Sequence, residues 1–312
     1  MIAYELRELT KVYPRQRRPA NDGISLEIRE GEIFGLLGDN GAGKTTAVRQ
    51  MVGVLAPTSG SIVLFGKDVR GDPLHVTTHV GYMPQEARPL NNATVGASLV
   101  WTARLRGLSR RDAAAEGARL LEQFGLGAIR DKPSSRLSGG ERRLMRLAVA
   151  MAGRPPVLIL DEPTNDLAPQ RRRMVWELLG AMNREAGTTV IFITHDAIEA
   201  ERAIQRVGIL RQGKLVAVGA PGALKKVVDR KVRLELFFNP VAPPWGGDAL
   251  RLEGLGDGAP REVAPGRWLV TVERADVGAV LERLDLAALE DFHIRSATLE
   301  DLYVYYTEES GG

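Results

Sequence analysis

The sequence predicts an α/β fold built around a parallel sheet that is covered on both faces. Three short apolar runs carry this prediction, at residues 33–37, 157–160 and 190–193. None of them alternates between apolar and polar residues, and continuous apolar strands are typical of parallel sheets buried between helices. Residues 171–186, between the second and third runs, have the length and spacing of a crossover helix, so strands and helices alternate along the chain.

Two regions surround this core. Alternating residues at 4–9 and 24–28 predict strands near the N-terminus, and the strand-rich pattern continues through 61–66 and 80–84. From about residue 90 to 151 apolar residues recur at helical spacing instead, as in 113–124, where Ser109 is a candidate N-cap. We therefore expect a helical subdomain inserted into a strand-rich domain.

The character of the chain changes again near residue 229. An alternating segment at 232–237 precedes a Pro/Gly-rich stretch at 240–266. Patterns of a strand, a helix, a strand and a helix follow at 268–272, 275–284, 292–295 and 299–306. We predict a first domain over residues 1–228 and a small α+β domain over 229–312.

Composition narrows the possible functions. The 312 residues are 44% hydrophobic and 26% charged, with a net charge of +3 from 42 basic and 39 acidic side chains. This balance is ordinary for a globular protein and does not by itself point to nucleic acid. The absence of cysteine excludes disulfides and thiolate metal sites. We expect a cytoplasmic protein, because no apolar run approaches the roughly 18 residues of a membrane helix.

The stretch from Gly38 to Thr46 carries the strongest chemical signal. It reads Gly-Asp-Asn-Gly-Ala-Gly-Lys-Thr-Thr and lies between an apolar strand and a helical pattern. Its spacing is that of a phosphate-binding loop, in which small residues let backbone N–H groups turn toward a polyphosphate at a helix N-terminus. Lys44 can reach the outer phosphates, and the Thr45 hydroxyl is placed to ligate Mg²⁺.

Polar residues also follow the other two apolar runs. Asp161 and Glu162 come directly after 157–160, and His195 follows the run at 190–193. Ligands of open α/β sheets bind beyond the carboxyl ends of the strands. An aspartate there can hold the Mg²⁺ that bridges the phosphates, and the neighbouring carboxylate can take a proton from an attacking water. We expect His195 to contact the γ-phosphate or that water.

These elements, together with Gln85 and the sequence Leu-Ser-Gly-Gly-Glu at 137–141, resemble the ATP-binding subunit of ABC transporters over roughly residues 4–225. The resemblance implies a P-loop NTPase (RecA-like) core with an N-terminal antiparallel β subdomain and a helical subdomain. It also implies ATP and Mg²⁺ as cofactors, with two copies of the chain clamping ATP head to tail.

The resemblance carries over residue by residue. One copy would hold ATP, and the other would cap its γ-phosphate with Ser138, Gly139 and Gly140. Glu162, His195, Gln85 and Lys44 would act in hydrolysis, and Thr45, Gln85 and Asp161 at Mg²⁺. The nucleotide would be bound by Tyr13, Gly38, Asn40, Gly41, Ala42, Gly43, Lys44, Thr45 and Thr46. Tyr13 corresponds to the aromatic residue that stacks on adenine.

Two positions depart from the family pattern. Asp39 stands where the family often has proline, which places an extra negative charge near the phosphates. Ala168 occupies the usual aspartate position of the loop that connects the two ATP sites, and Asp166 is the nearest candidate to replace it.

A single set of motifs, with room for a helical subdomain but not a long coiled coil between Gly38 and Ser138, favours transport. The tail at 297–306 resembles ATPases that serve ABC-2-type exporters such as the daunorubicin-resistance class. It implies a separately encoded membrane permease, attachment at the inner face of the membrane, and a C-terminal domain that steadies the dimer. The alternative is a soluble ABC-type ATPase that acts on nucleic acid or ribosomes; we expect no nucleic acid partner.

Overall fold

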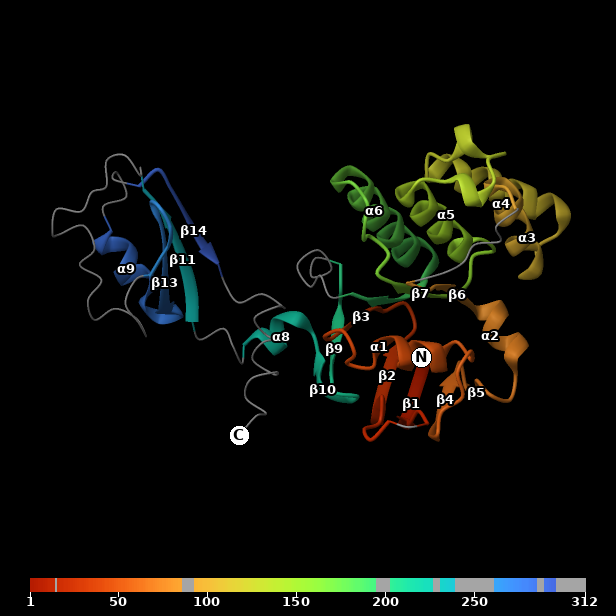
Figure 1. Ribbon diagram of the computed structural model, residues 1–312, viewed down its shortest axis with the longest axis horizontal. Coiled ribbons are helices and arrows are strands. Elements are labelled where there is room, and N and C mark those ends of the chain that lie inside the picture. Colours follow the sequence, from red (N-terminus) through yellow and green to blue (C-terminus); the bar gives the residue numbers. More distant parts are fainter. Residues whose placement is uncertain are drawn as a thin grey trace. The chain divides into compact units, whose positions relative to one another are not determined.

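The computed structural model describes residues 1–14, 16–85, 93–194, 203–226, 231–238, 261–284 and 289–295. The chain forms two compact units, Met1–Gly219 and Ala220–Gly312, which are shown in Figure 1. The domain boundary expected between residues 228 and 229 lies outside the described residues. Each unit has its own hydrophobic core, so each is considered by itself.

A four-stranded sheet opens the first unit, with strand order β2-β1-β4-β5. Its strands pair antiparallel, as the N-terminal β subdomain requires. Leu6 pairs with Leu26 on one side and with Ile62 on the other, which places three buried side chains in one row across the sheet. The strands are β1 (Ile2–Lys11), β2 (Asn21–Arg29), β4 (Ser59–Leu64) and β5 (Lys67–Asp68).

The second sheet of this unit has the order β10-β9-β3-β8-β7-β6 and is parallel except for β10. The three apolar runs become neighbouring strands, and every residue of β3, β8 and β7 is buried, as predicted. Their carboxyl ends therefore meet at one edge. The strands are β3 (Ile33–Leu37), β6 (Val80–Met83), β7 (Val157–Asp161), β8 (Thr189–Ile193), β9 (Arg206–Arg211) and β10 (Lys214–Gly219).

Helix α1 (Lys44–Met51) packs into the core shared by the two sheets. Ala47, Val48 and Met51 are buried there, together with residues of β1, β3, β7 and β8. The hydroxyl of Tyr4 on β1 donates a hydrogen bond of 3.0 Å to the Met51 carbonyl at the last turn of the helix. The helix is thus held at its C-terminal end, which fixes the direction of its N-terminal end.

The longer helices lie on the side of the parallel sheet opposite α1 (Figure 1). The predicted helical subdomain contains α3 (Val95–Leu105) and α4 (Arg110–Gln123), followed by the 3₁₀ turns Gly127–Ile129 and Ser134–Arg136 and by α5 (Gly139–Met151). Ser109 caps α4, as predicted, by accepting the Asp112 N–H at 3.1 Å. The crossover helix is α6 (Pro169–Ala186), which contacts β8, and α2 (Pro73–His79) precedes β6.

The second unit contains α8 (Pro221–Lys225) and an antiparallel sheet of order β12-β13-β11-β14, on which α9 (Val277–Arg283) packs after a 3₁₀ turn at Arg274–Asp276. Its strands are β11 (Lys231–Phe237), β12 (Arg261–Ala264), β13 (Arg267–Glu273) and β14 (Asp291–Arg295).

Strand β12 falls within the Pro/Gly-rich stretch at 240–266, where no strand was predicted. Pro265 and Gly266 form the turn of a hairpin between β12 and β13, with φ +74° at Gly266, and do not end the ordered structure. The predicted helix at 299–306 lies outside the described residues. In the part of the chain that is described, no helix combines the length and apolar character needed to cross a membrane.

Candidate functional site

The loop from β3 to α1 is shaped by glycines that approach other backbone segments. Gly43 has φ +103°, and a Cβ there would lie 2.2 Å from the Ala20 carbonyl oxygen. A Cβ on Gly38 would lie 2.5 Å from the Leu210 carbonyl oxygen. Both contacts are with backbone, which cannot move aside as a flexible side chain can. The glycine spacing is therefore required by the surrounding chain as well as by any ligand.

Asn21, at the start of β2, supports this loop and was not identified from the sequence. Its fully buried side chain donates to the Gly43 carbonyl at 3.0 Å and accepts from Gln50 Nε2 at 2.7 Å. It joins the antiparallel sheet to both the N-cap and the last turn of α1. No local pattern distinguishes this asparagine from one in an exposed turn, because its partners lie more than 20 residues away along the chain.

The start of α1 has no side-chain cap, because its N-cap residue is Gly43. The ammonium of Lys44 lies over the loop and donates to the carbonyls of Gly38 at 2.5 Å and Asp39 at 2.9 Å. Burial lowers the pKa of Lys44, while the negative charges of Glu162 and Asp161 act against this shift. A buried cation beside an uncapped helix N-terminus makes this a strongly anion-favouring point of the structure.

A cleft of about 720 Å³ opens over this loop. The sequence had identified ten of its lining residues: Tyr13, Asn40, Gly41, Gly43, Lys44, Thr45, Thr46, Gln85, Asp161 and Glu162. It had not assigned a binding role to six others: Gln16, Arg18, Pro19, Ala20, Asp39 and Gln212. Several distant segments therefore meet at one cleft around the phosphate-binding loop.

The remaining expected residues fall into three groups. Gly38 and Ala42 are buried and shape the loop without lining the cleft. Ser138, Gly139 and Gly140 do not line the cleft among the residues described for one chain. His195 lies outside the described residues. The tyrosine expected at adenine is at the cleft, where its hydroxyl is 3.5 Å from Thr46 Oγ1.

Asp161 ends β7 and faces the start of α1. Its Oδ2 atom accepts from the Thr45 hydroxyl at 3.4 Å. Burial, and then the neighbouring charge of Glu162, raise the pKa of Asp161 to about 6. A hydroxyl and a carboxylate beside a phosphate-binding loop are the oxygen ligands that suit Mg²⁺, which usually takes one or two protein ligands and completes its shell with phosphate and water. The donor set therefore fits this ion.

Glu162 is held in an unusual backbone conformation. Its φ is +51°, a left-handed value that costs a non-glycine residue roughly 1–2 kcal/mol. Its N–H donates to the Ile193 carbonyl at 2.8 Å, and its side chain accepts from the Thr194 hydroxyl at 3.2 Å. The side chain is almost fully buried. Backbone and side chain are thus both fixed at the ends of β7 and β8.

Arg143 of α5 also holds this residue and was missed by the sequence analysis. Its guanidinium donates to the Glu162 carbonyl at 2.6 Å and to Asp166 Oδ2 at 3.1 Å. Asp166, considered above as a replacement for the aspartate absent at Ala168, therefore pairs with the Leu-Ser-Gly-Gly-Glu helix of its own chain. Arg143 thus joins the Leu-Ser-Gly-Gly-Glu helix directly to the segment that carries Glu162.

The start of α5 is closed by its own side chains. Ser138 Oγ accepts the Glu141 N–H at 3.3 Å, and Glu141 Oε2 accepts the Ser138 N–H at 2.8 Å, which forms a capping box. Lys132 pairs with Glu141 at 3.1 Å. The Ser138 N–H, followed by Lys132, lowers the pKa of Glu141. Ser138 and Gly139 are exposed, so this helix start is accessible from outside the chain.

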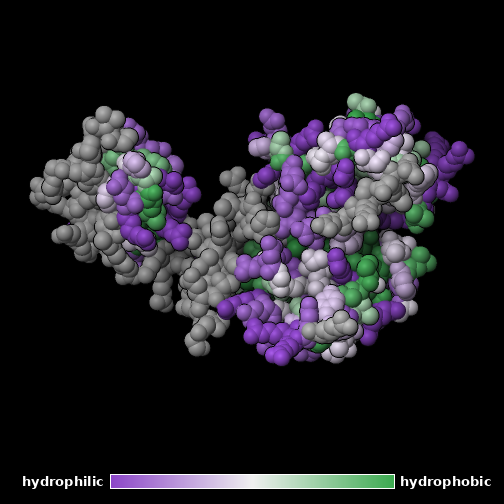
Figure 2. Space-filling model, in the orientation of Figure 1, coloured by the Kyte–Doolittle hydropathy of each residue, from purple (hydrophilic) through white to green (hydrophobic). Residues whose placement is uncertain are grey.

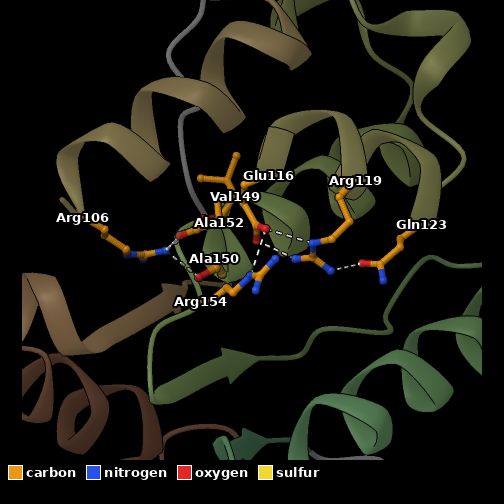
Figure 3. A network of polar contacts seen from close by, with 8 residues as sticks. All are labelled: Arg106, Glu116, Arg119, Gln123, Val149, Ala150, Ala152 and Arg154. Carbon is orange, nitrogen blue, oxygen red and sulfur yellow. Dashed lines mark hydrogen bonds and ion pairs between the residues drawn. The ribbon is translucent and has the colours of Figure 1, made fainter. Parts of the chain in front are cut away.

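A polar network anchors the opposite end of α5 (Figure 3). Arg106, just after α3, donates to the Ala150 carbonyl at 2.8 Å, and burial lowers its pKa to about 10. Nearby, the buried carboxylate of Glu116 accepts from Arg119 at 2.9 Å and from Arg154 at 3.1 Å. These bonds tie α3, α4 and the segment after α5 together, so the exposed helix start is carried on a rigid support.

The strand–loop–helix with its lysine, the parallel sheet and the carboxylates at the adjacent strand end define a P-loop NTPase fold. A family model described as ABC transporter matches residues 21–165. The daunorubicin/doxorubicin resistance ATP-binding protein DrrA of Streptomyces peucetius is 37% identical over 235 residues, which cover 75% of this chain and 70% of the relative. The Nod factor export ATP-binding protein I of Burkholderia thailandensis is 41% identical over 203 residues, 65% of this chain and 66% of the relative.

The chain belongs to the ABC transporter ATP-binding family, whose activity is ATP hydrolysis. It is also 35% identical over 98% of its length to the ATP-binding cassette sub-family A member 7 of Rattus norvegicus, but spans only 14% of that relative. The fold matches a dimeric post-hydrolysis state of the ATP-binding cassette MJ0796 bound to ADP and Pi. That match has a TM-score of 0.65 and 23% identity, and it covers 70% of this chain and 98% of the other.

Proposed function

We propose that this chain is the ATP-hydrolysing subunit of a transporter and drives a separately encoded membrane permease. The observation that carries the proposal is the cleft that brings together Lys44 and Thr45 at the start of α1 with Asp161 and Glu162 at the end of β7. Phosphoryl transfer to water needs a cation at the phosphates, oxygen ligands for Mg²⁺ and a group that orients the water, and these four side chains supply such groups.

At its own cleft, the uncapped start of α1 and the Lys44 ammonium bind the phosphates of ATP. Tyr13 offers its ring to the adenine. Thr45 and Asp161 hold Mg²⁺, and when bound this ion neutralises charge on the phosphates. A carboxylate ligates a metal ion in its ionised form, whereas burial raises the pKa of Asp161 and favours the protonated form. A bound cation would act against this shift and favour ionisation.

Glu162 orients the attacking water and accepts its proton, as a general base does. Its carboxylate is buried and held by Thr194 and its backbone by Arg143, so it is positioned before a nucleotide arrives. Gln85, at the cleft, is assigned to Mg²⁺ and the water. His195, which follows the apolar run 190–193 in the sequence, is assigned to the γ-phosphate or the water.

The cleft of one chain includes none of the Ser138–Gly140 residues among those described, and their helix start is exposed. In the proposed head-to-tail dimer this helix start closes the cleft of a second copy. Transition-state charge is then stabilised only when the two copies meet, which couples hydrolysis to closure. The MJ0796 cassette, whose fold this chain shares, is dimeric in its post-hydrolysis state, and this supports the arrangement.

Export through a permease at the inner face of the membrane is supported by similarity to the Nod factor export protein and by the C-terminal tail. Co-purification with a polytopic membrane protein is the expected outcome. Salt-dependent binding to DNA or RNA in its place would favour the alternative of a soluble ATPase acting on nucleic acid.

The direct test is Glu162→Gln in the full chain. Turnover should fall on the order of 10²-fold or more, because a positioned base is lost, while ATP affinity stays at the parental level. Glu177→Gln is the matched control, since this glutamate is exposed on α6 and forms its ion pair with Arg173, one turn away on the same helix. Near-parental hydrolysis by Glu162→Gln would disprove the assignment.

A further inference from the structure

Strand β14 is an edge strand of the C-terminal sheet in the part of the chain that the structure describes. Among the described residues it pairs with β11 alone, in a regular antiparallel register without a bulge. All five of its residues, Asp291 to Arg295, are exposed. Proteins often protect such edges with proline, a bulge or charged side chains, because an open edge accepts another strand. β14 has no proline and no bulge, and its charged residues, Asp291 and Arg295, have opposite signs, so they do not repel every incoming strand.

One face of this edge is apolar. Phe292 pairs with Leu236 and Ile294 pairs with Leu234, so all four side chains lie on the same face of the sheet. The two leucines are fully buried, whereas Phe292 is 38% and Ile294 is 46% exposed. Figure 2 shows a strip of hydrophobic surface bordered by hydrophilic residues over the sheet of this unit. The apolar core face thus continues to the open edge.

The opposite face of β14 carries polar side chains of opposite charge at its two ends. Along the strand they are Asp291, His293 and Arg295. Within the chain, His293 contacts Asp291 at 3.2 Å, and Arg295 contacts Glu235 of β11 at 3.4 Å. Asp291 and Arg295 remain mostly exposed, so both can take a further partner.

We propose that β14 pairs antiparallel with β14 of a second copy, with the two-fold axis at His293. Asp291 then lies opposite Arg295 of the partner subunit, and Phe292 lies opposite Ile294 of the partner subunit. Symmetry repeats both pairs, which gives two ion pairs on one face and two apolar pairs on the other. Opposite charges and apolar pairs directly across strands are the stabilising combinations.

Other registers do not give this complementarity. A parallel arrangement sets Asp291 against its own copy. A one-residue slip places apolar side chains opposite polar ones and moves them to the wrong face. A two-residue slip in one direction sets His293 against Arg295 of the partner subunit and leaves Asp291 without a partner within the strand. In the other direction it sets Asp291 against His293 of the partner subunit and leaves Arg295 without one. The register centred on His293 is therefore the one that pairs all five residues of the strand.

This contact deepens the proposed homodimer but does not depend on nucleotide. Five residues a side make a small interface, so its effect is to keep two copies at a high local concentration while the ATP clefts open and close. The C-terminal domain would then steady the dimer through one continuous sheet across both copies.

Disulfide trapping tests the register directly, because the chain has no cysteine of its own. Residues directly opposite in an antiparallel pair have Cα atoms about 4.5–5.5 Å apart, within the span of a disulfide. His293→Cys in the full chain should form a disulfide dimer under mild oxidation, with or without ATP. Val263→Cys, on the opposite edge strand β12 and 54% exposed, is the matched control. Equal yields from the two variants would overturn the proposal.

Charge exchange provides a second readout in the His293→Cys background. Phe292→Lys or Ile294→Asp alone should lower the disulfide yield several-fold, because each puts a charge opposite an apolar side chain. The double variant should recover it, since the introduced lysine of each copy faces the introduced aspartate of the other. Failure of the folded double variant to recover the disulfide yield would overturn the proposed register, since residues 292 and 294 would then not face each other.

Adding Lys44→Ala to His293→Cys separates this inference from the proposed function. The variant should lose ATP binding at the cleft but keep the disulfide dimer. Loss of trapping in His293→Cys, with the Glu162→Gln result intact, would refute only the β14 contact. The reverse pair of results would refute only the assignment at the cleft.

Discussion

The starts of α1 and α5 are both glycine-containing helix N-termini, yet they are built in opposite ways. At α1 the N-cap is Gly43 in a left-handed conformation, with no side-chain cap. At α5 the N-cap is Ser138, and its capping box with Glu141 satisfies two backbone N–H groups. Helix N-termini carry partial positive charge and unsatisfied donors. The first is left open for an anion, whereas the second is already stable on its own.

The two helix starts also differ in how closely the rest of the chain surrounds them. The start of α1 lies within a cleft lined by several segments, and its glycine is pressed against backbone. Gly139 at the start of α5 has open space where a Cβ would be. The start of α1 is thus surrounded by its own chain, whereas the start of α5 is exposed, as the proposed contact with a second copy requires.

Gly43→Ala should have the largest effect. A methyl group there would meet the Ala20 carbonyl oxygen at 2.2 Å, at a φ of +103° that alanine rarely adopts. The loop must shift, and because a small misplacement of binding groups is costly, we expect ATP affinity to fall on the order of 10²-fold. A fluorescent ATP analogue measures this, and Gly139→Ala should bind it as the parent does. Parental affinity in Gly43→Ala would contradict this account of the loop.

Gly139→Ala should keep the affinity for ATP and lower turnover. Nothing lies within 4 Å of the new methyl group inside the chain, so the fold and the single-copy affinity for ATP should be retained. In the proposed dimer the same methyl group stands between the helix start and the partner's γ-phosphate. Turnover should drop by about 10-fold to 10²-fold. Unchanged turnover would show that this helix start does not act on a second cleft.

Asp161→Asn tests the charge beside α1 through stability. Burial raises the folded-state pKa to about 6, above the unfolded value of about 3.9. The folded state therefore binds more protons in this window, and stability decreases as pH rises from about 4 to 6. Without nucleotide and Mg²⁺, Asp161→Asn should gain about 1–3 kcal/mol above pH 6 and lose this advantage below pH 4. Identical pH slopes for parent and variant, measured by thermal unfolding, would refute it.

Ser138→Ala should have the smallest effect on the isolated chain. It removes the acceptor of the Glu141 N–H, which costs about 1 kcal/mol, or roughly 2–4 °C in Tm for a unit of this size. The matched gain is Ala168→Asp, because Ala168 is the N-cap of α6 and makes no capping bond. A similar rise in Tm is expected there. No loss in Ser138→Ala would mean that the capping box is not stabilising.

Local patterns were enough to predict the phosphate-binding loop, the three buried strands and the carboxylates at a strand end. Each depends on residues close together in sequence, and the buried strands could be recognised because continuous apolar runs are compatible with few other environments. Strand β12 was missed because local pattern alone does not indicate it. Its Pro265–Gly266 turn has the composition of a connection, and only pairing with β13 makes it a hairpin.

The amino-acid sequence by itself determined which chemical groups are available: a lysine on a glycine loop, a hydroxyl and carboxylates of the kind that ligate Mg²⁺, and a serine–diglycine helix start. The tertiary structure alone decided which of these groups meet. It placed Asn21 under the loop, joined Arg143 to Glu162, and left Ser138 outside the cleft of its own chain. These outcomes depend on contacts between residues far apart in sequence, and such contacts are set by how whole sheets and helices pack rather than by local pattern.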